Sequence, residues 1–471
     1  MSTALTILHF LIFAALGLRI LARQQLNPST RVVWILVLLA VPYFGALLYL
    51  LVGEIHFSGK PLARLNAAKA TTRAFVADSG AAPDIERWGG ASAFASTING
   101  FGVAEGNRGE LLESPEGARA RLIADVEAAK TSVDVLYYIW LDDNTGRAMA
   151  DALIAAVQRG VRCRAMVDAI GSSRMIKSET WARMKAAGVE TAIALPIKDL
   201  IGTMFSRRID LRNHRKISVI DGHILHCGSQ NCADPEFRVK PKFAPWVDIM
   251  VRFEGPVARQ MHLLFVQDWM TEHGGAPEGV DQPIAPFAAG FPAQVVGTGP
   301  TISRDITAQL FSRLANEAKR ELIISTPYFV PGENVCIAIM GAARAGVAVT
   351  LIVPRRNDSG FVAKASRSYY PSLVAAGVKI AEFNGGLLHS KTLTIDGEIT
   401  FMGSSNMDIR SFDLNFENDV LLRDAALTTD IRGRQMQYLA ASTPVEPEEV
   451  KNWPLWKRIW LNAFAVVGPV L

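Results

Sequence analysis

The stretch that decides the fold is His214–Gly222, HRKISVIDG, because it returns later in the chain as His389–Gly397, HSKTLTIDG. Each copy reads His-x-Lys-x4-Asp and is followed by Gly-Ser-x-Asn. The serine follows its histidine by 15 residues in both copies, and the asparagine follows it by 17. Such a repeat indicates two similar halves. The candidate site residues are His214, Lys216, Asp221, Ser229 and Asn231 in the first half, and His389, Lys391, Asp396, Ser404 and Asn406 in the second.

The spacing within each copy suits a strand that ends in a tight turn. Residues i and i+2 of a strand face the same side, so each histidine shares a face with its lysine. The Asp-Gly pairs fit hairpin turns, and the returning strand brings Ser and Asn back toward the histidine. For Asp221 and Asp396, a purely structural role in these turns is an equal alternative to a catalytic one.

Two such strands that meet symmetrically would form a receptor for a phosphodiester. Two imidazoles, two ammonium groups and two amides would converge on one point. Histidine is a competent nucleophile at phosphorus, and lysine and asparagine can stabilise charge on the phosphoryl oxygens. We therefore expect catalysis without a metal or any other cofactor.

The segments around the motifs alternate between helical and strand-like patterns. Val133–Trp140 and Val161–Asp168 are strand-like in the first half, as are Glu321–Phe329 and Val347–Pro354 in the second. Alternation of this kind predicts an α/β fold, here two lobes with pseudo-two-fold symmetry. The expected units are a two-helix anchor (1–53), a linker (54–109), a first lobe (110–290), a second lobe (291–440) and an amphipathic C-terminal segment (441–471).

Composition limits the classes of partner. A net charge of +4 over 471 residues is too small to indicate nucleic-acid binding, although it suits phosphate headgroups. The four cysteines lack paired spacing. Cys227 and Cys232, with His223 and His226 nearby, form the one candidate metal cluster, and small residues on a strand explain them better. Disulfides stay open.

The hydrophobic residues concentrate near the N-terminus. Val32–Val52 contains 21 residues without a charge, enough for a helix to cross a bilayer. Thr3–Leu18 is shorter and predicts a second crossing helix, with a signal peptide as the less favoured alternative. Flanking basic residues are balanced, so the orientation is unresolved.

Two further segments could meet lipid. Ile197–Ile209 is extra length in the first half, either a membrane-facing lip or an ordinary connection. Near the C-terminus, Trp453, Trp456 and Trp460 accompany Lys457 and Arg458. This pattern suits a membrane interface, and packing against the enzyme body is an almost equal alternative.

The paired motifs resemble those of the phospholipase D superfamily, and the flanking sequences indicate a more specific family. FSRRIDLRNHRK, PWVDIMVRFEGPVA, TPYFVPGE, GGLLHSKTLTIDG and NMDIRSFDLNFEN resemble bacterial cardiolipin synthases, as do the N-terminal apolar segments. This resemblance covers essentially the whole chain. It implies a multi-pass protein of the bacterial inner membrane that transfers a phosphatidyl group from one phosphatidylglycerol to another and releases glycerol.

The resemblance also implies residue roles. One motif histidine forms a phosphohistidine, while the other protonates the leaving oxygen and deprotonates the acceptor. Enzymes of the superfamily usually use the first motif histidine as nucleophile, which implies His214 as nucleophile and His389 as acid and base. The symmetry of the two motifs leaves open which histidine has which role. Each histidine should be held by a carboxylate further along its own half, which suggests Glu417 for His389 and Asp248 for His214.

Several alternatives remain at this point. Phosphatidylethanolamine could replace one phosphatidylglycerol, and a homo-oligomer is open. Rival functions are a hydrolytic phospholipase D, a nucleic-acid phosphodiesterase, and a membrane scaffold with a dead site. The two anchor segments disfavour the phosphodiesterase, and the two intact motifs disfavour the scaffold.

Overall fold

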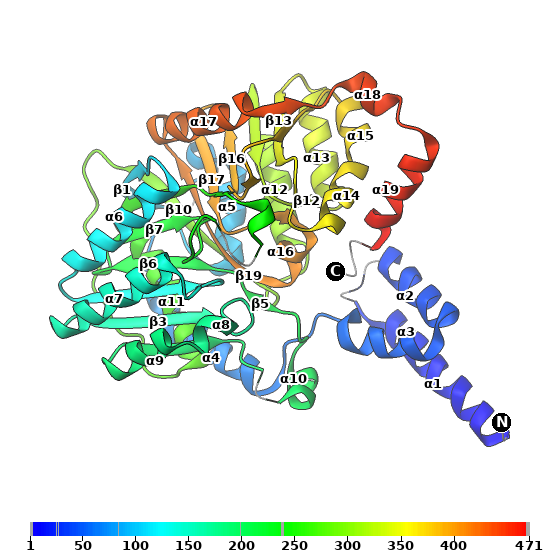
Figure 1. Ribbon diagram of the computed structural model, residues 1–471, viewed down its shortest axis with the longest axis horizontal. Coiled ribbons are helices and arrows are strands. Elements are labelled where there is room, and N and C mark those ends of the chain that lie inside the picture. Colours follow the sequence, from blue (N-terminus) through cyan, green and yellow to red (C-terminus); the bar gives the residue numbers. More distant parts are fainter. Residues whose placement is uncertain are drawn as a thin grey trace.

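The computed structural model describes residues 3–467 apart from 25, 27, 83, 198 and 237–239. Residues 1 and 2 of the expected anchor and 468–471 of the C-terminal segment lie outside this part. Figure 1 shows a large α/β body with a small group of helices projecting from one end. These helices are α1 (Thr3–Ala22), α2 (Pro28–Ala40), α3 (Pro42–Leu48) and the π-helix η1 (Tyr49–Gly53).

The long uncharged segment near the N-terminus does not form the single helix that the sequence predicts. It breaks at Val41, whose φ of −136° and ψ of 71° lie outside the helical region. Pro42 follows, and a proline disfavours the helical conformation of the residue before it. Among the helices of the described residues, none is both long and apolar enough to cross a membrane.

The body consists of two α/β lobes, as the repeated motif predicted. A linker with α4 (Gly59–Ala77) and α5 (Ile85–Asn99) precedes them. The first lobe comprises β1 (Ala104–Leu111), α6 (Pro115–Ala128), β2 (Ser132–Tyr137), α7 (Asn144–Gln158), β3 (Arg162–Asp168), α8 (Ser173–Ile176), α9 (Glu179–Ala186), β4 (Glu190–Ala194), α10 (Leu200–Ser206), β5 (Arg212–Asn213), β6 (Lys216–Ile220), β7 (Ile224–Gly228), η2 (Pro241–Phe243), β8 (Trp246–Val247), β9 (Met250–Glu254) and α11 (Pro256–Glu272).

The second lobe repeats this order and adds a C-terminal extension. It comprises β10 (Phe291–Thr298), α12 (Ile306–Glu317), β11 (Glu321–Ser325), β12 (Phe329–Val330), α13 (Glu333–Arg344), β13 (Ala348–Pro354), α14 (Gly360–Ser368), α15 (Tyr370–Ala375), β14 (Lys379–Phe383), β15 (Leu387–Leu388), β16 (Thr392–Ile395), β17 (Ile399–Gly403), β18 (Met407–Asp408), α16 (Ile409–Asp413), β19 (Asn415–Arg423) and α17 (Ala425–Ala440). The extension holds β20 (Ser442–Pro444), α18 (Pro447–Lys451) and α19 (Leu455–Val467).

One continuous sheet runs through both lobes. Its order is β20-β14-β13-β11-β16-β17-β19-β10-β1-β9-β7-β6-β2-β3-β4. Outward from the antiparallel β1–β10 pair, the first lobe adds β9, β7, β6, β2, β3 and β4, and the second adds β19, β17, β16, β11, β13 and β14. Corresponding strands therefore occupy corresponding places, and the seam lies between β1 and β10.

The two lobes share a hydrophobic core at this seam. Strands β2 and β16 are buried along their whole length, as strands covered on both faces are. Helix α11 contacts β10 of the other lobe, and α17 likewise contacts β1. One core cluster contains Val251 and Phe253 from the first lobe with Val295 and Val420 from the second. The seam is thus an interior of the protein, and it fixes the two motif strands relative to each other.

The linker packs on the first lobe and also pairs with it through backbone hydrogen bonds. Helix α4 packs on α11. The chain just before α4 pairs with the extra segment of the first lobe: Ser58 N donates to Ser206 O at 2.7 Å, and Arg208 N donates to His56 O at 3.1 Å. The sequence left open whether this extra segment is a membrane-facing lip or a connection. In the structure it links the chain that follows the N-terminal helices to the chain that leads to His214.

Candidate active site

Two short parallel strand pairs join the lobes where the motifs begin. Strand β5 pairs with the start of β19, with Asn213 opposite Phe416. Strand β8 pairs with β15, with Val247 opposite Leu388. The next residues continue the alignment, since His214 N donates to Phe416 O at 2.9 Å and His389 N donates to Val247 O at 2.8 Å. Each motif histidine is therefore positioned by the backbone of the opposite lobe.

This register pairs each histidine with a carboxylate from the other lobe. His214 Nδ1 lies 2.8 Å from Glu417 Oε2, and His389 Nδ1 lies 2.6 Å from Asp248 Oδ1. The expectation that each histidine uses a carboxylate of its own half was wrong. Glu417 and Asp248 are indeed the carboxylates that hold the histidines. However, Glu417 follows Phe416, which pairs with the chain before His214, and Asp248 follows Val247, which pairs with the chain before His389.

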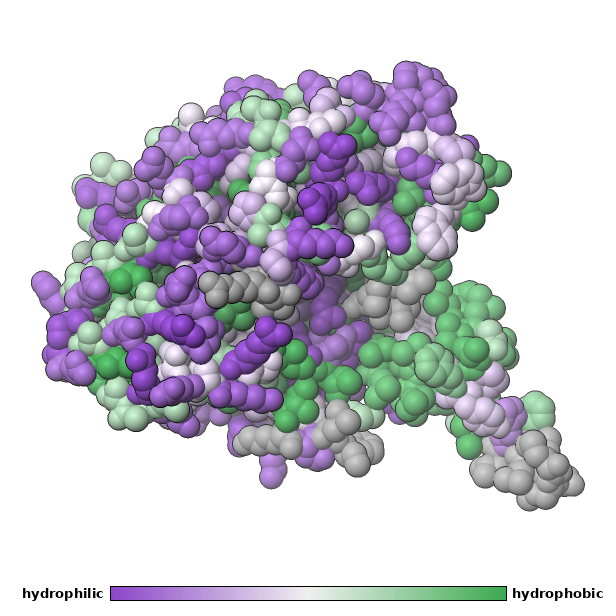
Figure 2. All heavy atoms as spheres, viewed as in Figure 1, coloured by the Kyte–Doolittle hydropathy of each residue, from purple (hydrophilic) through white to green (hydrophobic). Residues whose placement is uncertain are grey.

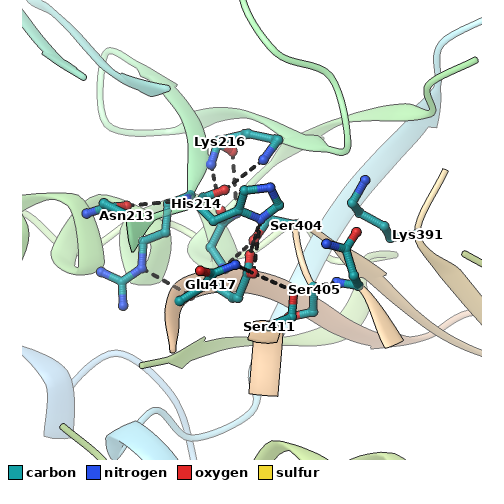
Figure 3. Close-up of polar contacts among 12 residues, drawn as sticks. Asn213, His214, Lys216, Lys391, Ser404, Ser405, Ser411 and Glu417 are labelled. Atoms are coloured by element: carbon teal, nitrogen blue, oxygen red, sulfur yellow. Dashed lines mark hydrogen bonds and ion pairs between the residues drawn. The ribbon is translucent and has the colours of Figure 1, made fainter. Parts of the chain in front are cut away.

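The serines of the motif tails support these carboxylates. Ser404 Oγ donates to Glu417 Oε2 at 2.5 Å (Figure 3), and Ser229 Oγ donates to Asp248 Oδ1 at 2.7 Å. Glu417 Oε1 also accepts hydrogen bonds from Ser411 Oγ at 2.8 Å and from Asn415 Nδ2 at 3.1 Å. The two His-carboxylate pairs are thus similar in geometry, but Glu417 has more donors around it than Asp248.

Burial keeps both imidazoles neutral near pH 7. Burial lowers the pKa of His214 to about 4, and the positive charge of Lys216 adds to this against the attraction of Glu417. Burial and the nearby Lys391 likewise lower the pKa of His389 to about 4. Since an ionised carboxylate only accepts, each Nδ1 carries the proton, and the lone pair of Nε2 is left for chemistry.

The carboxylates remain ionised in spite of their burial. Burial alone would raise the pKa of Asp248, but the attraction and hydrogen bond of His389 bring it down to about 2. Burial also tends to raise the pKa of Glu417, but the attraction and hydrogen bond of His214 bring that pKa below its usual value. Both carboxylates can therefore fix the tautomer of their histidine and stabilise an imidazolium when one forms.

The two motif lysines form a concentrated positive site. Lys216 Nζ donates to the carbonyl oxygen of His214 at 2.7 Å, and Lys391 Nζ donates to that of His389 at 2.6 Å. Burial lowers the pKa of Lys216 to about 8. Burial and the charge of Lys216 lower the pKa of Lys391 to about 7. A bound phosphate anion would relieve this repulsion and raise both pKa values.

Both histidines open into a cavity of about 450 Å³. Its polar lining residues include the motif asparagines Asn231 and Asn406, together with Asp408 and Asn415. Its walls are largely apolar, with Ile139, Leu141, Val330, Phe361, Val362 and Ile409 among the lining residues. A lining that combines polar groups with apolar side chains suits a molecule with a charged headgroup and hydrocarbon chains.

Asp221 and Asp396 do not reach this cavity, so placing them among the catalytic residues needs correction. Asp221 accepts hydrogen bonds from the backbone nitrogens of residues 130, 131 and 132, before β2. Asp396 accepts from those of residues 319, 320 and 321, before β11. Each aspartate sits in the left-handed region of a hairpin turn, at the end of the strand opposite to the histidine. Their contacts are structural.

Sequence reasoning missed several residues around the site. The ring of Tyr138 lies 4.7 Å from that of His214, and the ring of Trp246 lies 4.5 Å from that of His389. Ser411 and Asn415 lie within NMDIRSFDLNFEN, where the sequence alone assigns them no role. Spacing from the motif could not find the two aromatic residues, because strand pairing brings them there: β2 pairs with β6 beside Tyr138, and β8 pairs with β15 beside Trp246.

The cysteines do not contribute to a metal site. Within the described part of the chain, no group of three His, Cys, Asp or Glu side chains is placed to hold a metal ion. Cys163, Cys227, Cys232 and Cys336 are buried and unpaired with one another. The candidate cluster around Cys227 is part of β7, where His226 Nε2 contacts Asp125 Oδ2 at 2.7 Å.

Comparison with known proteins agrees with this geometry. Residues 122–269 and 311–436 match the family model described as cardiolipin synthase, PLD-like domain, and residues 10–54 match the model described as phospholipase D-nuclease N-terminal. Cardiolipin synthase A of Edwardsiella ictaluri is 35% identical over 98% of this chain and 97% of its own length. Cardiolipin synthase A of Klebsiella pneumoniae is 36% identical with the same coverage.

A solved structure supports the fold. The crystal structure of phosphatidylserine synthase from Haemophilus influenzae matches 77% of this chain and 95% of its own, with a TM-score of 0.58 and 15% sequence identity. At that identity the likeness concerns the arrangement of the two lobes alone.

Proposed function

The chain belongs to the cardiolipin synthase family of the phospholipase D superfamily, and we propose that it joins two phosphatidylglycerol molecules into cardiolipin and releases glycerol. The observation that carries this proposal is the pair of crossed His-carboxylate contacts, His214 with Glu417 and His389 with Asp248, at one cavity with apolar walls. Such a site offers one nucleophile and one proton carrier to the same phosphorus atom.

The first step forms a covalent intermediate. Nε2 of His214 attacks the phosphorus of the first lipid, and the bond from phosphorus to the headgroup oxygen breaks. His389, protonated when the phosphate anion binds beside it, gives its Nε2 proton to that oxygen, and glycerol leaves. Lys216 and Lys391 stabilise the charge on the phosphoryl oxygens. A phosphatidyl group is then bonded to His214.

The second step transfers this group to the acceptor. The now neutral His389 removes the proton from a glycerol hydroxyl of the second phosphatidylglycerol. The hydroxyl oxygen attacks phosphorus, and the bond from phosphorus to His214 Nε2 breaks. Cardiolipin forms, and the proton taken by His389 restores the acid for the next cycle.

The surroundings of the two carboxylates support this division of roles. Glu417 accepts hydrogen bonds from Ser404, Ser411 and Asn415 in addition to its contact with His214, so a dense set of donors fixes the orientation of His214. Asp248 has a shorter contact with His389 and the hydroxyl of Ser229. We therefore assign proton transfer to His389 and attack to His214.

The membrane location is part of the same proposal. We place the protein in the bacterial inner membrane as a multi-pass enzyme, with the N-terminal helices as its anchor. Phe10, Leu39, Tyr43 and Phe44 expose large apolar side chains there, which supports contact with lipid rather than water. Phosphatidylethanolamine as a second substrate and self-association remain expectations from the resemblance.

The test is a product analysis with purified full-length enzyme in vesicles of labelled phosphatidylglycerol. The assay contains EDTA, since lysines supply the positive charge at the phosphate. We expect cardiolipin and glycerol in equal amounts. Phosphatidic acid as the main product would favour a hydrolase and overturn the proposal. Cleavage of an added oligonucleotide, or no product at all, would favour the phosphodiesterase or the scaffold.

A further inference from the structure

Helix α19 has two apolar faces, and the enzyme body covers one of them. Leu461 is buried, and Phe464 packs on Phe361 with ring centroids 5.3 Å apart. Just before the helix, Trp453 is buried, and Lys457 Nζ lies 3.9 Å from the centre of its ring. The expected alternative of packing against the enzyme body therefore applies to this inner face.

The outer face of α19 is also apolar. Leu455, Trp456, Ile459, Trp460 and Val466 are each between 53% and 69% exposed. At about 100° per residue, these positions fall within an arc of roughly 140°, away from Leu461. A surface helix of a globular body normally presents polar side chains on that face. Two tryptophans on this outward side indicate that something other than bulk water covers it.

The inner face connects α19 to the reaction cavity. Phe361 and Val362, on α14, line the cavity that contains His214 and His389. On the outer side of α14, Lys364 Nζ lies 4.5 Å from the ring centre of Phe464 and 5.6 Å from that of Trp460. One helix, α14, therefore separates the cavity from α19.

We propose that the outer face of α19 rests on the surface of an anionic phospholipid bilayer and, through α14, holds the cavity mouth at the lipid. Tryptophans beside basic residues, here Lys457 and Arg458, are typical of helices that lie in a membrane interface. Figures 1 and 2 show α19 at the same end of the molecule as α1–α3, where hydrophobic residues also gather. The inference rests on the proposed function only for the entry of lipid into the site.

The shared end favours lipid over a second copy of the chain. An interface between two copies needs a complementary apolar surface. It does not require basic side chains beside the tryptophans, and it does not require that the helix lie near a cavity for lipid. An anionic bilayer accounts for all three features: the apolar stripe, the charges at its border and the cavity behind it. Self-association through α19 is therefore an outcome that the experiment must be able to detect.

A fluorescent probe on the outer face tests contact with lipid directly. The native cysteines are buried, so Ile459→Cys can be labelled selectively in the full-length protein. The matched control is Ile337→Cys on α13, which is 55% exposed. In anionic vesicles, brominated lipid should quench the probe at position 459 and leave the control unchanged. Quenching at position 459 by aqueous iodide, or cross-linking of two copies through the thiol introduced there, would overturn the proposal.

A second experiment tests the effect on turnover. Trp456→Ser combined with Ile459→Ser should lower the rate on vesicles by about tenfold or more, because two apolar side chains no longer hold the mouth at the bilayer. The rate on a short-chain phosphatidylglycerol below its micellar concentration should stay within about twofold of wild type. Equal loss on both substrates would contradict a surface role. Absence of cardiolipin from wild type would refute the proposed function instead, and the probe result would still decide the role of α19.

Discussion

Single residues distinguish the two halves of a site that has nearly symmetric geometry. His214 and His389 have the same tautomer, similar burial and similar pKa values. What differs is the carboxylate behind each ring, with Glu417 surrounded by more donors than Asp248. We therefore expect the proposed roles of the two histidines to depend on the neighbours of their carboxylates, and substitutions can test this.

The two histidines should fail in different ways. With a donor that has a good leaving group, His389→Ala should still form the adduct on His214 and then stall, because it lacks the base for the acceptor. His214→Ala should form no adduct. Both should lose roughly 10²–10⁴-fold in turnover. Mass spectrometry of the acid-labile adduct locates it, and an adduct on His389 in the His214→Ala protein would reverse the assignment.

The crossed contacts predict that each carboxylate affects the histidine of the other lobe. Glu417→Gln should slow adduct formation, since it disturbs His214. Asp248→Asn should spare adduct formation with the same activated donor and slow its transfer, since it disturbs His389. Rapid-quench measurement separates the two rates. If Glu417→Gln slowed only the second step, the carboxylate would be acting on its own half after all.

The motif lysines should set the alkaline side of the pH profile. Both must be protonated to stabilise the phosphate, and burial has lowered the pKa of Lys391 to about 7 and that of Lys216 to about 8. The ratio kcat/KM, which reports the free enzyme, should therefore fall as pH rises through this range. In Lys391→Arg the remaining activity should fall at a higher pH, because a guanidinium stays charged. An unchanged midpoint would point to another group.

At the scale of the element, the sequence predicted more of the strands than of their contacts. The strand-like patterns placed β3 and β13 within one residue at each end, whereas the stretch predicted for β2 runs three residues past its end at Tyr137. The expected strand Glu321–Phe329 is in fact divided into β11 and β12, because residues 326–328 leave the sheet. The crossed carboxylates could not be predicted, because β5–β19 and β8–β15 are pairs of two residues without a pattern of their own.

The hairpin aspartates belong to the stability of these elements. Asp221→Ala should cost about 1–3 kcal/mol in the free energy of unfolding, because the backbone donors before β2 lose their acceptor. Alanine is also strained at a φ of +49°. Asp221→Asn, which keeps an acceptor and tolerates this conformation, should cost less. Thermal denaturation measures the change, and kcat of the folded enzyme should stay close to wild type. A large fall in kcat without a fall in Tm would return Asp221 to the chemistry.

At the scale of the whole molecule, the lobes form one body and the N-terminal helices are attached to it at one end. The concentration of apolar residues before Glu54 is the sequence signal for this separate group of helices. The prediction of one helix over Val32–Val52 rested on the absence of charge and gave no weight to Pro42 as a helix breaker. Reading α4 as part of a linker missed its packing on α11, which depends on contacts between distant segments.

Removal of residues 1–53 should leave a folded enzyme. The cut lies before His56 and Ser58, so their backbone hydrogen bonds with Arg208 and Ser206 are kept in the truncated protein. Activity should fall more on vesicles than on lipid dispersed in detergent, because the body loses one attachment to the bilayer. Circular dichroism and the two activity assays check this. A truncated protein that unfolds would show that the body extends into the N-terminal helices.

The exchange of carboxylates across the seam also bears on how such a protein could arise. A solitary half would hold its histidine without a carboxylate, and its carboxylate without a histidine. An ancestor with one half could therefore have worked only after meeting a copy of itself, each supplying what the other lacked. Fusion of two genes would have preserved that exchange within one chain. It would also have allowed the two halves to diverge in sequence, and the surroundings of Glu417 and Asp248 are now unequal.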